Sequence, residues 1–165
     1  MTEKLSVLNA EVKSAYPKLF KFALHLSGNK SDAHDLVMDA VKGTFEIVHK
    51  TNELPDNSEA YMIKSIKTSF GASMKFKKRF VPTDDFEPFL SSTDDMERSD
   101  PLLKRKINQA LFSISDVCRE VLTLIALGYS YEEIQETTGI KLNTVRSKLS
   151  RCREAFKGKM SSALQ

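Results

Sequence analysis

The sequence predicts an all-α protein in which two small helical domains are joined by an acidic flexible linker. Apolar residues recur at helical spacing on both sides of residues 81–100, and no alternating pattern long enough for a β-strand occurs. Residues 81–100 contain Pro82, Pro88, two Asp-Asp pairs and no sustained period, which is typical of a linker. We therefore expect one domain at residues 1–80 and another at residues 101–165.

The charge of the chain changes sign at the same places. Residues 1–80 carry 13 Lys and Arg against 9 Asp and Glu, and residues 101–165 carry 11 against 6. Residues 81–100 carry one Arg against seven acids. The net charge of +3 therefore conceals two basic blocks separated by an acidic spacer, which favours a negatively charged partner for the basic blocks.

The sequence favours a cytoplasmic protein that is not inserted in a membrane. It has no run of about 18 apolar residues, and its first residues, MTEKLSVLNAEVKSAYPK, carry charges throughout and no apolar secretory core. The two cysteines, Cys118 and Cys152, lack the spacing of metal ligands and lie within helical patterns. We expect both to be reduced, half-buried thiols.

An enzyme is the least favoured class of protein. His25, His34 and His49 are separated by nine and fifteen residues and suggest no metal site, and His34 is interpreted as a surface residue. The sequence contains no Gly-rich phosphate loop, nucleophile elbow or paired catalytic carboxylates. We therefore expect no catalytic residue, no metal and no cofactor.

The first domain is predicted to begin with two helices. A first apolar stripe ends near Ala15, and Pro17 then fits the first turn of a second helix over residues 18–27. Gly28 is expected to end that second helix. The stripe of the first helix consists of Leu5, Leu8, Val12 and Ala15.

Two further helices complete the first domain. Ser31 can cap the third helix, and a fourth helix is expected from about Glu59 towards Arg79. The residues of the third helix expected in the core are Ala33, Leu36, Val37, Ala40, Val41, and Phe45 or Val48.

The second domain predicts a helix-turn-helix. Ser115 can cap a helix that Gly128 ends, and Ser130 and Glu133 have the spacing of a capping box at the start of a short helix that ends near Gly139. A short turn then leads into a basic helix, which completes the pattern. The expected core positions before this motif are Leu103, Ile107, Ala110, Leu111, Val117, Val121, Leu122, Leu124 and Ile125.

The basic helix divides into an apolar seam and a polar face. The seam consists of Val145, Leu149, Cys152 and Phe156. The opposite face is bordered by Arg146 and Arg151, which suits the DNA major groove, where Arg binds guanine, Asn binds adenine and Ser binds base edges or phosphates. An ordinary exposed helix would explain the basic composition alone, whereas the capping box, glycine turn and seam together favour DNA binding. The candidate DNA-binding residues are Lys141, Asn143, Thr144, Arg146, Ser147, Ser150 and Arg151, with Lys148, Arg153, Lys157 and Lys159 expected near phosphates.

Three stretches of the sequence resemble one known family. Two of them resemble the promoter-binding domain four of extracytoplasmic-function (ECF) sigma factors, the small bacterial members of the sigma-70 family. These two are SYEEIQETTGIKLNTVRSKLSRCREAF and the preceding ALFSISDVCREVLTLIALGYS. GNKSDAHDLVMDAVKGTF resembles domain two of the same family. The resemblance implies a factor that binds core RNA polymerase and directs it to promoters, with domain two at residues 1–80, an acidic linker at 81–100 and domain four at 101–165.

The resemblance also implies partners for particular residues. Asp32, Asp35 and Asp39 correspond to an acidic helix that docks on the clamp helices of the largest polymerase subunit, and the flap of the second largest subunit is a further contact. Acid near a helix N-terminus would explain Asp32 and Asp35 without a partner, but it explains Asp39 less well. The residues expected to contact the −35 element by this resemblance are Arg146, Ser147, Ser150 and Arg151. The linker is expected to mimic nucleic acid near the RNA path, to act as a simple tether, or to do both. An anti-sigma factor is a further partner that stays open.

The predicted fourth helix, AYMIKSIKTSFGASMKFKKRF, departs from the family pattern. Met62 stands where a tryptophan is usual, Ser69 where an asparagine is usual, and Lys67 replaces a small residue. Because extruding a DNA base costs a few kcal/mol, we expect weakened or altered recognition of the −10 element, assisted by a separate DNA-targeting protein. The candidate −10 contacts are Lys67, Ser69, Lys75, Lys77, Lys78 and Arg79.

Two other functions stay open at the level of the sequence. One is a transcriptional regulator that binds DNA through its helix-turn-helix and uses residues 1–80 as a sensor or dimerisation module. The other is a sigma mimic that occupies an anti-sigma protein and does not initiate transcription. Binding to core polymerase discriminates a sigma factor from the regulator, and the basic face of the last helix argues against the mimic.

Overall fold

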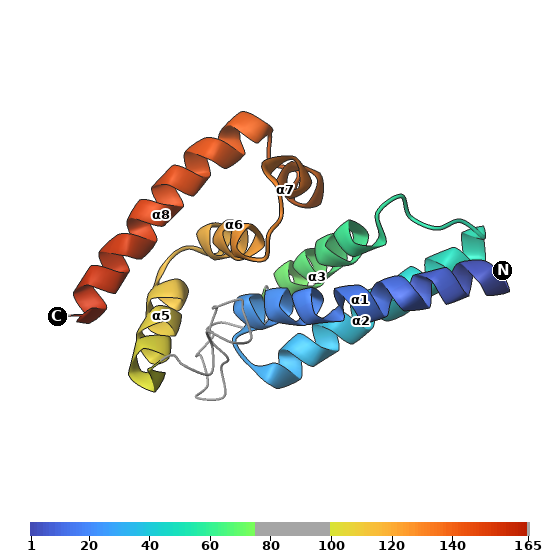
Figure 1. The fold of residues 1–165 in the computed structure, drawn as a ribbon, viewed down its shortest axis with the longest axis horizontal. Helices are drawn as coiled ribbons and strands as arrows, with labels where there is room; N and C mark the ends of the chain where they lie inside the picture. Colours follow the sequence, from blue (N-terminus) through green and yellow to red (C-terminus); the bar gives the residue numbers. More distant parts are fainter. Residues whose placement is uncertain (75–99, 165) are drawn as a thin grey trace. The chain divides into compact units, whose positions relative to one another are not determined.

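The structure of the protein, a computed structural model, describes residues 1–74 and 100–164 (Figure 1). The chain divides into two compact units, Met1–Val81 and Pro82–Gln165, which are called the N-terminal and C-terminal units below. All regular secondary structure in the described ranges is helical, so the predicted all-α class is confirmed. The predicted helix end at residues 75–79 and nearly all of the predicted linker lie outside the described residues.

Three helices pack on one another in the N-terminal unit. These are α1 (Thr2–Ser27), α2 (Lys30–Thr51) and α3 (Ser58–Met74). Their shared core contains Leu8, Leu19, Phe22, Val37, Val48, Met62, Ile63 and Ile66, each at most 1% exposed. Burying this apolar surface is the main force that holds the three helices together.

Helix α1 is continuous through Pro17, so the prediction of two helices in this stretch is wrong. Pro17 lies on the exposed side of α1, while Ala15 and Leu19 on either side of it are buried. A proline within a helix removes one N–H donor and disturbs one carbonyl. Because the buried stripe keeps its helical phase past Pro17, packing on α2 and α3 outweighs this local cost. Gly28 ends α1 as predicted, with a left-handed φ of 77° and its N–H donated to the carbonyl of Leu24.

Helix α2 is capped by Asn29, whereas the sequence had predicted Ser31. The Asn29 Oδ1 accepts from the backbone N–H of Asp32 at 2.7 Å, and its Nδ2 donates to Asp32 Oδ2 at 2.8 Å. Because the chain reverses at Gly28 and α2 begins at Lys30, Ser31 already lies within the first turn. The residues of α2 that the core buries are Ala33, Leu36, Val37, Ala40, Thr44 and Val48, whereas Val41 and Phe45 are half-buried.

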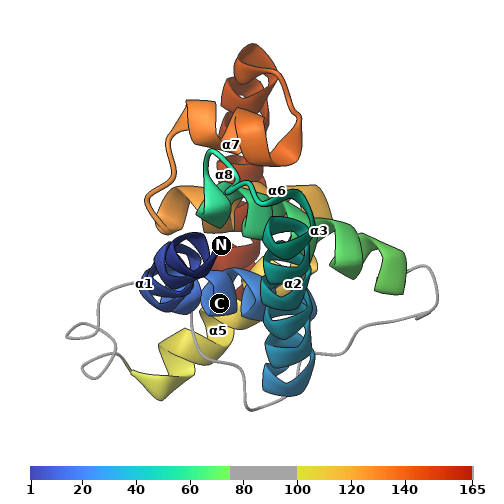
Figure 2. The same cartoon turned by 90° about the vertical axis from the view of Figure 1, so that its right-hand side faces the viewer.

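Four helices form the described part of the C-terminal unit. They are α5 (Pro101–Ser113), α6 (Asp116–Ala126), α7 (Tyr131–Thr138) and α8 (Leu142–Leu164). Helices α5, α6 and α7 all pack against α8, the longest of the four (Figures 1 and 2). The predicted cap at Ser115 is confirmed, because its Oγ accepts from the backbone N–H of Cys118 at 3.2 Å.

Two residues predicted in the core of this unit are exposed. Leu103 is 37% exposed and Val117 is 41% exposed. Both lie in the first turn of their helices, before the stripe that meets α8 begins. The buried stripes start later, at Ala110 in α5 and at Arg119 in α6.

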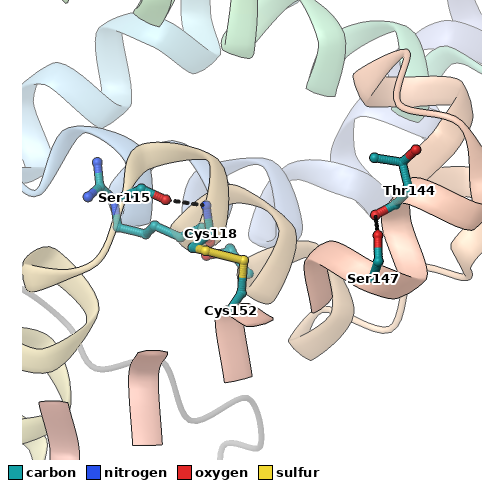
Figure 3. The surroundings of a disulfide bond; sticks show 7 residues. Ser115, Cys118, Thr144, Ser147 and Cys152 are labelled. Carbon is teal, nitrogen blue, oxygen red and sulfur yellow. Dashed lines mark hydrogen bonds between the residues drawn. A yellow bond between two sulfur atoms is a disulfide. The ribbon is translucent and has the colours of Figure 1, made fainter. Parts of the chain in front are cut away.

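Cys118 and Cys152 form a disulfide bond that joins α6 to α8, so the prediction of reduced thiols is wrong for this structure (Figure 3). Their Cα atoms are 5.1 Å apart, within the usual range of about 4.4–6.8 Å. Cys152 is 2% exposed and Cys118 is half-buried. Tertiary packing brings the two side chains together across 34 residues of sequence, and no local pattern reveals such a pairing.

None of the helices in residues 1–74 and 100–164 combines the length and the apolar content that crossing a membrane requires.

Candidate nucleic-acid interface

The helix-turn-helix is formed by α7, a short turn and α8. The predicted capping box is present at the start of α7: Glu133 N–H donates to Ser130 Oγ, and Ser130 N–H donates to the Glu133 carboxylate, each at 3.1 Å. At its end, Gly139 adopts a left-handed φ of 74° and donates its N–H to the carbonyl of Gln135. These caps fix both ends of an eight-residue helix that would be marginal in isolation.

The side chain of Gln135 ties α7 to the start of α8. Its Oε1 accepts the backbone N–H of Leu142 at 3.1 Å, although the two residues are seven apart in sequence. The N–H of Leu142 is one of the first four N–H groups of α8, which have no partner within the helix. Thr138 closes the turn, because its Oγ1 accepts from the N–H of Ile140 at 3.2 Å. The sequence prediction did not include Gln135, and the only available signal was an amide side chain close to the turn.

The predicted seam of α8 faces the core of the unit. Val145, Leu149 and Cys152 are 0%, 1% and 2% exposed, and Phe156 is half-buried. Ile134 of α7 is also fully buried at 0% exposed, and α7 packs against α8. The seam therefore fixes the rotation of α8 about its axis, which decides which side chains face solvent.

Every candidate DNA-binding residue of α8 and of the turn before it is exposed. These residues are Lys141, Asn143, Thr144, Arg146, Ser147, Ser150 and Arg151. The Ser147 hydroxyl donates to the backbone carbonyl of Thr144 at 3.1 Å, within the same turn of the helix (Figure 3). Arg146 and Arg151 lie five residues apart, with Ser147 and Ser150 between them. The structure thus presents guanidinium and hydroxyl groups together on one solvent-facing side of a firmly packed helix, an arrangement that can reach base edges and phosphates.

Arg119 is a buried arginine of the C-terminal unit. It is 4% exposed, its Nη2 donates to Asp116 Oδ1 at 2.8 Å, and its Cζ lies 4.4 Å from the ring centroid of Phe112. Burial lowers the pKa of Arg119, while the charge and the hydrogen bond of Asp116 act in the opposite direction. The ion pair with Asp116 lies within α6, whereas the cation–π contact with Phe112 joins α6 to α5. Because the side chain is buried, it is not available to DNA.

The structure describes only two of the candidate −10 contacts. Lys67 and Ser69 lie on α3 and are half-buried. The other four, Lys75, Lys77, Lys78 and Arg79, lie outside the described residues. Met62, at the position where the family usually has tryptophan, is fully buried in the core of the N-terminal unit.

The three candidate polymerase contacts on α2 differ in their surroundings. Asp32 is half-buried and forms the reciprocal cap with Asn29. Asp35 and Asp39 are exposed, and Met38 between them is 46% exposed. Asp35, Met38 and Asp39 therefore share one exposed face of α2 and are accessible to a partner. The prediction omitted Met38, although it lies out of phase with the buried stripe of α2.

The described residues contain no group of three or more His, Cys, Asp or Glu side chains that could hold a metal ion. His34 is exposed, in agreement with its interpretation as a surface residue. His25 is buried, and its Nδ1 lies 2.7 Å from the carbonyl of Lys21.

The family model for sigma-70 region 4 matches residues 104–156. Two curated relatives extend the similarity to 88% of the chain. The ECF RNA polymerase sigma factor SigE of Mycolicibacterium smegmatis is 29% identical over 152 residues, and the ECF RNA polymerase sigma factor EcfG of Rhodopseudomonas palustris is 25% identical over 147 residues. The chain spans 58% of the length of the first relative and 81% of the second. The chain is therefore similar to ECF sigma factors over most of its length, and to sigma-70 region 4 over residues 104–156.

The fold is similar to that of a solved sigma factor. The sigma factor RpoE of Bartonella quintana, solved in complex with the anti-sigma factor NepR, superposes with a TM-score of 0.73 and 24% sequence identity, over 93% of this chain and 96% of that one. The region 4 match covers most of α5, all of α6 and α7, and α8 as far as Phe156. It therefore includes α7, the turn and all candidate DNA contacts from Lys141 to Arg151.

Proposed function

We propose that this protein is an ECF sigma factor that binds core RNA polymerase and directs it to promoter DNA. Residues 1–80 act as sigma domain two, residues 81–100 act as an acidic linker, and residues 101–165 act as sigma domain four. The observation that carries the proposal is the exposed face of α8 around Arg146 and Arg151, held by a buried seam within the stretch that matches sigma-70 region 4. A family member of this kind is not expected to be an enzyme.

In this proposal α8 reads the −35 element. Arg146 and Arg151 donate to guanine or to phosphates, Ser147 and Ser150 bind base edges or phosphates, and Lys141, Asn143 and Thr144 anchor the start of the helix on the backbone. On α2, Asp35 and Asp39 dock on the clamp helices of the largest polymerase subunit, with Met38 as the apolar centre of the contact. Asp32 acts mainly through the cap that it shares with Asn29.

The test begins with purified core polymerase from the source organism. The expected result is co-purification of the two, followed by run-off transcription from a subset of random promoter fragments. The double variant Arg146→Ala/Arg151→Ala is expected to keep polymerase binding and to lose at least about tenfold in promoter occupancy, since each base-reading arginine contributes about 1–3 kcal/mol.

The matched control is Lys13→Ala, which also removes a positive charge but lies on an exposed position of α1. It is expected to leave promoter occupancy unchanged. A chain that binds DNA but does not bind core polymerase would be a helix-turn-helix regulator, and the proposal would be wrong. A chain that binds an anti-sigma protein but neither DNA nor polymerase would be a sigma mimic.

We also propose that recognition of the −10 element is weakened, and that a separate DNA-targeting protein assists it. Support comes from Lys67 and Ser69 on α3, which replace a small residue and an asparagine of the family pattern. The experiment compares run-off transcription from a fully paired promoter and from one with unpaired strands at −10. The proposal expects markedly more product from the second template, and equal output from both would contradict it.

An anti-sigma factor is a further proposed partner, because the chain shares its fold with a sigma factor that was solved in complex with one. Competition between such a partner and core polymerase for the protein would support this proposal.

A further inference from the structure

The disulfide between Cys118 and Cys152 encloses the DNA-reading part of the protein. The two cysteines are 34 residues apart in sequence, and the loop that their bond closes contains most of α6, all of α7, the turn and the first part of α8. Cys152 directly follows Arg151 on α8, and its side chain enters the core on the side opposite the exposed arginines. The bond therefore joins the first turn of α6 to the middle of the helix that carries the candidate DNA contacts (Figure 3).

The two cysteine residues differ in their exposure to solvent. Cys152 is 2% exposed, whereas Cys118 is half-buried in the first turn of α6. Cys118 lies in the first turn of α6, close to the positive end of that helix. The nearest acid in the same turn, Asp116, is engaged by Arg119 at 2.8 Å. A small thiol or disulfide reagent can therefore reach Cys118 first, and Cys152 acts as the internal partner.

We propose that Cys118 and Cys152 form a reversible redox site that sets how firmly the DNA-reading helix is held, an inference that rests on the proposed function for its consequence. A factor that works on bacterial DNA does so in a compartment that keeps most thiols reduced, where disulfides are generally transient and serve redox sensing. In such a compartment the pair cycles between dithiol and disulfide, and it does not serve as a permanent cross-link.

The oxidant is a low-molecular-weight disulfide, written RSSR. The Cys118 thiolate attacks one sulfur of RSSR, which forms a Cys118–S–S–R mixed disulfide and releases RS⁻. Cys152 loses its proton and attacks the Cys118 sulfur, which closes the internal bond and releases the second RS⁻. Two protein thiols thereby lose two electrons and two protons, and RSSR takes them up as two RSH. Excess RSH reverses both steps.

The disulfide form keeps its ability to bind DNA to a higher temperature than the dithiol form. In it, the helix-turn-helix is complete and the candidate contacts of α8 are exposed. Closing the loop removes conformational freedom from the unfolded chain, so oxidation stabilises the C-terminal unit against unfolding. Reduction leaves the same reading face but lets α6 and α8 separate more readily.

The experiment uses the full chain, equilibrated with graded mixtures of glutathione and glutathione disulfide. Alkylation followed by intact-mass measurement distinguishes chains with two free thiols from chains with none. Binding to a fluorescent 30-base-pair random-sequence duplex is then followed while the temperature is raised. We expect one reversible transition to an internal disulfide, and DNA binding that persists to a temperature higher by about 10 °C or more in the oxidised chain.

The variants Cys118→Ser and Cys152→Ser make the result specific to this pair. In each variant, the temperature at which DNA binding is lost is expected to be the same in every glutathione mixture. Persistence of two free thiols in excess glutathione disulfide would overturn the inference, and so would formation of mixed adducts or intermolecular dimers alone. Equal temperature limits for the reduced and oxidised chains would also overturn it. Failure to bind core polymerase would overturn the proposed function and leave this redox result unaffected.

Discussion

Replacing Asp32 with alanine is expected to destabilise α2. Replacing Asp35 and Asp39 with alanine is expected to weaken polymerase binding and to leave the stability of α2 unchanged. Asp32 loses its hydrogen bond to Asn29 Nδ2 and its charge near the helix N-terminus, which together contribute about 1 kcal/mol. Asp35 lies beyond the first turn with its side chain 76% exposed, so the helix dipole contributes little there. Asp39 is exposed one turn further on, and removing two like charges four residues apart relieves a few tenths of a kcal/mol.

Hydrogen exchange of the amides in α2 measures the destabilisation of this helix in the full chain. A loss of about 1 kcal/mol corresponds to roughly fivefold faster exchange through local opening in the Asp32→Ala variant. Exchange in the Asp35→Ala/Asp39→Ala variant is expected to match the unmodified protein, while its affinity for core polymerase falls by about tenfold or more. Asn29→Ala is the matched control, because it breaks the same cap and leaves all three carboxylates in place.

The opposite pattern would refute this assignment of roles. If Asp32→Ala left exchange unchanged and lowered polymerase affinity as much as the double variant did, Asp32 would be a contact residue and not part of a cap. If Asp35→Ala/Asp39→Ala accelerated exchange throughout α2, the two carboxylates would be holding the N-terminal unit together.

Three further predictions concern the helix-turn-helix. Gln135→Ala removes the side-chain cap of Leu142 and is expected to cost about 0.5–2 kcal/mol in urea unfolding of the C-terminal unit, whereas Gln135→Glu, which keeps an acceptor, is expected to cost less. Gly139→Ala is expected to lower the free energy of unfolding by about 1 kcal/mol because of the left-handed φ of 74°, although a Cβ there would meet no neighbouring atom. Gly139→Asn is expected to recover part of this loss in the same assay. Leu149→Ala removes a side chain that is 1% exposed and is expected to cost about 2–5 kcal/mol, so DNA binding should be lost at a temperature well below that of the unmodified protein.

The sequence was sufficient for features that depend on residues three or four apart. The Ser115 cap and the Ser130–Glu133 capping box were both predicted correctly, because the donor and the acceptor lie within one turn of the same helix. The left-handed ends at Gly28 and Gly139 were also correct, since glycine tolerates that conformation without cost. The seam and exposed face of α8 followed from helical periodicity alone.

The features that the sequence did not reveal depend on packing between helices. Continuity of α1 through Pro17 is decided by a buried stripe that meets α2 and α3, and local rules for proline predict a break. The disulfide is decided by the contact of α6 with α8, which no spacing rule encodes. Gln135 reaches Leu142 only because the turn folds the two helices towards each other. In each case the deciding partner belongs to another helix.

The buried position of Met62 changes the argument about −10 recognition. From the sequence, Met62 counted as a departure from the family on the same footing as Lys67 and Ser69. In the structure Met62 is 0% exposed among the side chains of a three-helix core, where methionine fills irregular space. A tryptophan at this position would need space in the core and a partner for its indole N–H, so its replacement concerns packing first. Lys67 and Ser69 are half-buried on α3 and remain within reach of a ligand at the surface. The proposal of weakened −10 recognition therefore depends on Lys67 and Ser69, and Met62 lends it no support.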